Sequence, residues 1–286
     1  DGRVTCDGSQ HFTEGQTRFY DKKYLQFVPR TIQSNITFVL NATHDFCVDG
    51  AAAQPVSDIN INRRHMFSNF TLEAKAGQTV VMEKFANVYT TRDKEAAAIT
   101  VAELQNYALE QLKVDEAAGF DALAEESAQA WKDQVWDRAP IAIDGPGFDL
   151  LALRFAQYHL TLMTPAHDNR MNIGAKGLVG EGYKGHVFWD TEIFLLPYFI
   201  FNMPEIARSL EEYRYLSLSG AHAKAKHNGY EGAQFPWESA WLDDGEVTPE
   251  DMGTDVVTGQ LIKVWTGFIE IHITSDVAFG AWIYYE

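Results

Sequence analysis

The run Gly180-Glu-Gly-Tyr-Lys-Gly-His-Val-Phe-Trp-Asp-Thr-Glu192 holds the densest group of special-purpose side chains in this chain. It brings together glycines, a lysine, a histidine, aromatic rings and carboxylates. A segment that only has to pack needs few of these, because polar and charged side chains are costly to bury without partners. We interpret the run as part of a site, and the surrounding stretch 171–241 as the segment that organises the chain.

The spacing Gly180-x-Gly182-x-x-Gly185 matches the dinucleotide-binding fingerprint letter for letter. That fingerprint needs a strand before it, a helix that opens at it, and an acidic residue about twenty positions later. No strand-like apolar run precedes Gly180, since residues 172–177 have the composition of a loop. We therefore reject a Rossmann site and expect a glycine-rich loop whose backbone can approach a ligand or a helix end.

Trp189 and Asp190 form the sharpest local pattern. A tryptophan face stacks on the C–H face of a sugar ring, while an adjacent carboxylate accepts hydrogen bonds from neighbouring hydroxyls. Trp237 and Glu238 repeat the pairing about fifty residues later. These four residues are the candidate substrate-binding residues. Asp190 could also cap a helix that starts at Thr191, and the two roles are compatible.

Lys184, His186 and Glu192 are weaker candidates for the same site. His186 and Asp190 are four positions apart, with Glu192 nearby, but the three form no recognised string of metal ligands. No Gly-x-Ser-x-Gly nucleophile elbow occurs in the sequence. We expect neither a metal nor a cofactor.

The composition limits the possible partners. The 286 residues carry a formal net charge of −17 and are 46% hydrophobic, which predicts a folded chain of one large or two ordinary domains. The negative charge repels nucleic-acid backbones and anionic membrane surfaces. No window has the apolar length of a membrane span. We expect no nucleic acid or membrane partner, and a cytoplasmic location.

The chain divides into a strand-rich first part and a helix-rich second part. Alternating apolar and polar residues predict an antiparallel sheet, expected as a sandwich, with residues 75–78 as a hairpin connection. The predicted strands cover residues 24–28, 35–40, 58–61, 69–73 and 80–85.

From Asp93 to Trp136 the apolar spacing predicts a helical hairpin that Gly119 interrupts. Two prolines and two glycines within 139–147 mark a boundary. Further helices are predicted at 148–162 and from Pro204 onwards, and a helical pattern starts at Asp276.

Several strings, taken in order, resemble the phosphorylases of glycoside hydrolase family 65, the group that holds maltose, trehalose and kojibiose phosphorylases. They are Ile173-Gly-Ala-Lys-Gly-Leu, the run from Gly180 to Phe194, Ala207-Arg with Tyr213-Arg-Tyr, and Gly229-Tyr-Glu-Gly-Ala-Gln-Phe-Pro-Trp-Glu-Ser-Ala240. The resemblance covers the whole chain. It implies part of an N-terminal β-sandwich domain at 1–93, a helical linker at 94–140, and the first part of an (α/α)6 barrel catalytic domain at 141–286.

The resemblance also implies a reaction. Members of the group cleave an α-glucosidic disaccharide with inorganic phosphate as co-substrate, and they release β-glucose 1-phosphate and a free sugar with inversion. The family pair that matches Trp189 and Asp190 lies in the subsite for the transferred glucose. The match of Trp237 and Glu238 to the same wall is weaker.

The family's general acid sits in an Asp-Glu-Tyr-type string downstream of the segment that matches 271–276, and no such string occurs here. We therefore expect an internal fragment, inactive by itself, whose general acid lies beyond Glu286. Asp190 or Glu238 as the acid stays an alternative. Two other functions also stay open: an α-glucoside hydrolase of acid-trehalase type and a non-catalytic carbohydrate-binding protein. A homodimer is an expectation taken from the family.

Overall fold

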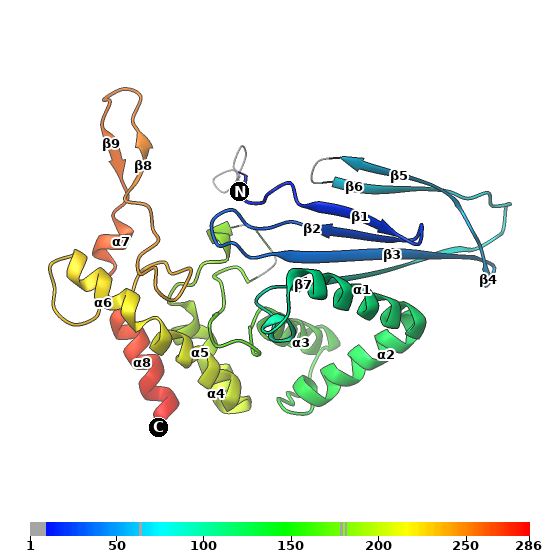
Figure 1. Ribbon diagram of the computed structural model, residues 1–286. Coiled ribbons are helices and arrows are strands. Elements are labelled where there is room, and N and C mark those ends of the chain that lie inside the picture. The colour runs from blue at the N-terminus through cyan, green and yellow to red at the C-terminus, as the bar shows by residue number, and fades with distance from the viewer. Residues whose placement is uncertain (1–9, 63–64, 178–179, 181) are drawn as a thin grey trace. The chain divides into compact units, whose positions relative to one another are not determined.

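The computed structural model describes residues 10–62, 65–177, 180 and 182–286 (Figure 1). The chain forms two compact units, of which the first ends at Ala130 and the second begins at Trp131. Among the described residues, no helix combines the length and apolarity that crossing a membrane would require.

The first unit is built on an antiparallel sheet, as predicted. Strands β1 (Gln16–Tyr20), β2 (Tyr24–Val28), β3 (Phe38–Val48), β4 (Ala51–Ala52) and β7 (Val80–Thr90) form one sheet, and β5 (Val56–Asn62) pairs with β6 (His65–Thr71). The antiparallel arrangement is confirmed, whereas the complete sandwich stays a prediction.

The prediction that residues 75–78 connect a hairpin is wrong. Strand β7 pairs with β3 along its whole length, from Phe38 opposite Thr90 to Val48 opposite Val80, and β6 pairs with β5 instead. The turn therefore joins strands of different sheets. The carboxylate of Asp49, at the end of β3, accepts a hydrogen bond from the Thr79 amide at 2.9 Å and so fixes where β7 enters.

Helix α1 (Val101–Ala118) begins at a capping box in which Thr100 and Glu103 satisfy each other's backbone amides. It lies along the sheet, with Leu104 and Ala108 packed in one cluster with residues of β2 and β3 (Figure 1). Gly119 ends the helix with φ +83°, and α2 (Phe120–Trp131) follows. The two predicted helices and the break between them at Gly119 are confirmed, whereas their packing against each other as a hairpin stays a prediction.

The second unit is mainly helical. After a π-helical turn (Lys132–Trp136) come α3 (Gly147–Leu162), a second π-helical turn (Thr191–Leu195), α4 (Leu196–Asn202), α5 (Pro204–Leu216), α6 (Leu218–His227), α7 (Thr266–Ile269) and α8 (Ile273–Tyr285). The helices predicted at 148–162 and from Pro204 are confirmed, and the helical pattern at Asp276 belongs to α8. The (α/α)6 barrel stays a prediction.

Leu196, Phe199 and Leu210 form the centre of the core of this unit, which joins α4 to α5. Strands β8 (Asp251–Thr254) and β9 (Leu261–Lys263) form an unpredicted hairpin that extends away from these helices (Figure 1).

Candidate functional site

An isolated β-bridge joins the two segments that carry the tryptophan and carboxylate pairs. The amide of Val187 donates to the carbonyl of Ser239 at 2.9 Å, and the amide of Ser239 donates back at 3.0 Å. The buried Ser239 hydroxyl also lies 3.0 Å from the hydroxyl of Tyr213 on α5. The two pairs predicted separately along the sequence are therefore neighbours in the second unit.

The aromatic rings of the two segments meet at one histidine. The ring of Trp189 lies 5.0 Å from that of His272, and the ring of Trp237 lies 6.3 Å from it, both edge to face. Phe188 packs against Trp237 with ring centroids 5.5 Å apart. Both tryptophans remain partly accessible, and His272 contacts both rings. An accessible indole ring is a surface on which the apolar C–H face of a sugar can stack.

A carboxylate accompanies each tryptophan. Oε1 of Glu238 lies 2.6 Å from Nδ1 of His186, and its Oε2 lies 3.2 Å from the Thr248 hydroxyl oxygen. Asp190 is half-buried, and this burial raises the pKa of its carboxyl group, with the nearby Glu192 adding to the rise. A carboxylate that has lost water is ready to gain hydrogen bonds from ligand hydroxyls.

The prediction that Asp190 also caps a helix is wrong. Its side chain makes no capping hydrogen bond, and its own φ and ψ of −59° and −38° are helical. A capping residue normally has an extended backbone, which directs its side chain towards the amides of the next turn. The Asp190 carboxylate is therefore not used by the helix end.

Glu192, a weaker candidate, lies in the interior rather than on a ligand surface. Its carboxylate receives two hydrogen bonds from Arg214, at 2.5 and 3.0 Å, and its side chain is 1% exposed. Arg214 also donates to the carbonyl of Phe188 at 2.6 Å. The Arg214–Glu192 pair therefore ties α5 to the segment that carries Trp189. This geometry gives Glu192 a structural role.

The glycine-rich loop has the irregular backbone expected of it. Tyr183 and Lys184 both adopt left-handed φ values, 58° and 56°, and Gly185 follows with +72°. Non-glycine residues rarely adopt this conformation, which stores strain and is typical of functional loops. Lys184 is exposed, and among the described residues its side chain forms no hydrogen bond or ion pair. The loop presents Lys184 to solvent.

His272, the meeting point of the two tryptophans, was not among the predicted site residues. Its Nδ1 lies 2.6 Å from Asp276 and its Nε2 lies 3.2 Å from Glu270. The i,i+4 spacing of His272 and Asp276 at the start of α8 is the pattern that could have indicated an oriented imidazole. Within the described part of the chain, no group of three or more His, Cys, Asp or Glu side chains is arranged to hold a metal ion.

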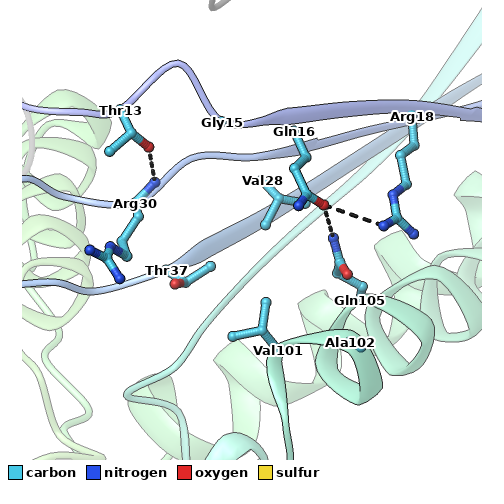
Figure 2. Close-up of a pocket in the computed structure, with 10 residues that line it drawn as sticks. All are labelled: Thr13, Gly15, Gln16, Arg18, Val28, Arg30, Thr37, Val101, Ala102 and Gln105. Carbon is cyan, nitrogen blue, oxygen red and sulfur yellow. Dashed lines mark hydrogen bonds between the residues drawn. The ribbon is translucent and has the colours of Figure 1, made fainter.

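A separate hollow of about 450 Å³ lies in the first unit, between the start of the sheet and α1 (Figure 2). Arg18 and Gln105 both donate to Oε1 of Gln16 there, at 3.3 and 3.5 Å. None of the residues that line it is a tryptophan or a carboxylate. The hollow therefore lacks the combination of ring and acid that defines the candidate site.

The chain thus has an antiparallel sheet unit followed by a mainly helical unit, and the two tryptophan and carboxylate pairs lie close together in the helical unit. The family description "Glycosyl hydrolase family 65, N-terminal domain" matches residues 1–134, and "Glycosyl hydrolase family 65 central catalytic domain" matches residues 154–286. The chain belongs to glycosyl hydrolase family 65.

Individual relatives agree with this membership. The chain is 45% identical to the kojibiose phosphorylase of Halothermothrix orenii and 36% identical to that of Escherichia coli, with all of this chain aligned in both cases. It spans 36% and 37% of the length of these curated relatives. A solved structure from the human microbiome has the same fold, with a TM-score of 0.72 at 20% identity, over 99% of this chain and 34% of that one.

Proposed function

We propose that this chain forms the glucose-binding part of an inverting disaccharide phosphorylase. The reaction is the cleavage of an α-glucosidic disaccharide by inorganic phosphate, to β-glucose 1-phosphate and a free sugar. The observation that carries the proposal is the convergence of the Trp189 and Trp237 rings at His272, with Asp190 adjacent to the first ring and Glu238 held by His186. Membership of family 65 and relatives that are named kojibiose phosphorylases support the reaction class.

In the proposed subsite, the two indole rings contact the apolar face of the glucosyl ring. Asp190 and Glu238 accept hydrogen bonds from its hydroxyl groups, and His186 orients Glu238 through the 2.6 Å contact. Inverting cleavage needs a carboxylic acid that protonates the leaving oxygen while phosphate attacks the anomeric carbon from the opposite face. We assign Asp190 and Glu238 to binding and propose that the acid comes from the remaining part of a family 65 catalytic domain.

Two measurements test the proposal. In the protein that carries this chain, kojibiose should be consumed only when phosphate is present, and β-glucose 1-phosphate should appear in equal amount. Release of the same amount of free sugar without phosphate would favour an α-glucoside hydrolase. Binding of glucose or β-glucose 1-phosphate without any cleavage would favour a non-catalytic carbohydrate-binding protein.

The binding role is tested separately by calorimetric titration of the chain with glucose and with β-glucose 1-phosphate. Asp190→Asn should weaken binding by roughly 1.5 to 3 kcal/mol, the usual worth of a hydrogen bond to a charged group. Asp144→Asn, at an exposed position in the loop before α3, is the matched control and should bind as the unaltered chain does. Equal affinity of Asp190→Asn and the control would contradict the binding role.

A further inference from the structure

Glu246 is a carboxylate that no sequence pattern indicated, and it is bound from several directions. It accepts hydrogen bonds from the backbone amides of Trp237 at 2.9 Å and Glu238 at 3.1 Å. The amide and hydroxyl of Thr248 donate to it at 3.2 and 2.8 Å, and Nζ of Lys224 donates at 2.5 Å. Five donors therefore converge on one side chain.

Two of these donors belong to the backbone that carries a predicted sugar contact. The amides of Trp237 and Glu238 lie outside regular helix and strand. The backbone next to them is held by the bridge at Ser239 and by a bond from the Val247 amide to the Glu238 carbonyl at 3.0 Å, but neither of these bonds uses the two amides. A carboxylate that accepts from two successive amides fixes the direction of both peptide units. Glu246 therefore fixes the two peptide units that the Ser239 bridge leaves unbonded, and so helps to set the positions of the Trp237 ring and the Glu238 carboxylate.

Lys224 connects this arrangement to α6. Its side chain is 2% exposed, so its charge has left water and depends on the ion pair with Glu246. A buried lysine with one carboxylate partner holds that partner in place, because separating the two leaves an unpaired charge in the interior. Lys224 therefore fixes Glu246 relative to α6.

The backbone of the Glu246 loop also rests directly on α6. A Cβ built on Gly220 would lie 2.7 Å from the backbone nitrogen of Gly245, which is closer than real contacts allow. Gly245 itself has φ +68°. Two glycines thus permit a close contact between helix and loop immediately before Glu246.

The Thr248 hydroxyl lies within hydrogen-bonding distance of both acids, 2.8 Å from Glu246 and 3.2 Å from Glu238. Glu238 in turn contacts His186 at 2.6 Å. A continuous set of polar contacts therefore runs from the buried Lys224 through Glu246 to the carboxylate and histidine of the candidate subsite.

We propose that Glu246 and Lys224 are positioning residues of the sugar subsite: they hold the Trp237–Glu238 backbone against α6 so that ring and carboxylate face the ligand together. This inference rests on the proposed function for its sugar ligand. The positioning itself can be measured without any ligand, so the two can fail independently.

The test uses the full chain and Glu246→Gln, with Glu250→Gln as control. Glu250 lies on the same loop, is exposed, and is 3.7 Å from the exposed His227. Backbone hydrogen exchange should become about tenfold faster or more at Trp237 and Glu238 in Glu246→Gln, while the amides of Leu210 and Tyr213 in α5 stay as protected as before. Glu250→Gln should leave all four amides unchanged.

The affinity for β-glucose 1-phosphate, measured by titration, should fall about tenfold or more in Glu246→Gln and stay constant in Glu250→Gln. Unchanged exchange at Trp237 and Glu238 would overturn the positioning role, and so would faster exchange with unchanged affinity. If the unaltered chain binds no sugar phosphate, the proposed function fails, and the exchange result alone decides the positioning.

Glu246→Gln leaves Lys224 without a charged partner and so could unfold the unit. Glu246→Asp retains the ion pair but shortens the side chain by one methylene, so that it cannot reach Lys224 and both amides at once. It should give faster exchange at Trp237 and Glu238 at close to normal stability. Protection equal to that of the unaltered chain would overturn the proposal.

Discussion

Arg214 and Arg208 lie on the same helix, α5, and bind carboxylates in opposite surroundings. The guanidinium of Arg214 is 3% exposed and pairs with the buried Glu192, whereas Arg208 is 70% exposed and pairs with Glu212 one turn further along. An exposed pair of this kind contributes under about 1 kcal/mol, because water already solvates both ions. Removing one member of a buried pair leaves the other charge without compensation.

We therefore predict that Arg214→Ala lowers the free energy of unfolding by about 3–5 kcal/mol, and that Arg208→Ala lowers it by less than about 1 kcal/mol. Urea denaturation followed by circular dichroism measures both. Because Arg214 also binds the carbonyl of Phe188, its loss should loosen the segment that carries Trp189. Similar losses of unfolding free energy in Arg214→Ala and Arg208→Ala would contradict the assignment of Glu192 to the interior.

The pKa of Glu211 also responds to the buried Arg214–Glu192 pair. Burial raises the pKa of its carboxyl group to about 7, and the neighbouring Glu192 adds to the rise while Arg214 opposes it. An added Cβ on Gly280 of α8 would lie 2.9 Å from Oε1 of Glu211, so the carboxyl group faces a helix that packs closely. Two acids share one arginine here, and the one that Arg214 does not contact directly retains its proton more readily.

At the scale of elements, the contact between α6 and the Glu246 loop leads to a prediction about glycine. Gly220→Ala places a Cβ 2.7 Å from the backbone of Gly245, so helix and loop must separate. We expect a loss of about 1–3 kcal/mol, the usual cost of overpacking, despite the better helix propensity of alanine.

The matched control is Gly147→Ala at the first residue of α3, where an added Cβ meets nothing within 4 Å. It should leave the urea midpoint unchanged or raise it slightly. Equal midpoints for the two variants would show that the contact between Gly220 and Gly245 is not tight in solution.

Elements with local start and stop signals could be predicted from the sequence. The break at Gly119 and the first-turn proline at Pro204 set helix boundaries within a few residues, whereas the helical region predicted from Asp93 begins as α1 only at Val101, after the capping box at Thr100. The pairing of β3 with β7 could not be predicted, because three strands lie between them in the sequence and no local pattern shows which strand is the neighbour. The β8–β9 hairpin was missed because its few residues are mostly exposed and do not alternate.

The candidate site was predictable in its parts but not in its assembly. Trp189 with Asp190, and Trp237 with Glu238, could each be selected from their chemistry alone. Their convergence depends on the bridge between Val187 and Ser239, a contact between distant positions that only the fold supplies. Glu192 was a candidate because, like Asp190, it is a carboxylate in the run that carries Trp189. Only its burial beside Arg214 distinguishes it from Asp190.

At the scale of the whole molecule, each unit has a hydrophobic core of its own. Leu104 is fully buried in the cluster formed by α1 and the sheet, and Leu210 is 1% exposed in the cluster of α4 and α5. Separate cores are what allow parts of a chain to unfold separately, and a net charge of −17 opposes compaction throughout. Heat should therefore unfold this chain in two transitions rather than one.

Calorimetry of core variants tests this expectation. Leu104→Ala and Leu210→Ala should each remove about 2–5 kcal/mol from the unit that contains the residue, because a cavity replaces buried methyl groups. We predict that each variant lowers the temperature of one transition and leaves the other in place, with hydrogen exchange identifying which unit has opened. Leu151→Ala, at a position 63% exposed on α3, should move neither transition by more than a degree or so. A single transition that both core variants lower equally would mean that the two cores unfold as one cooperative structure.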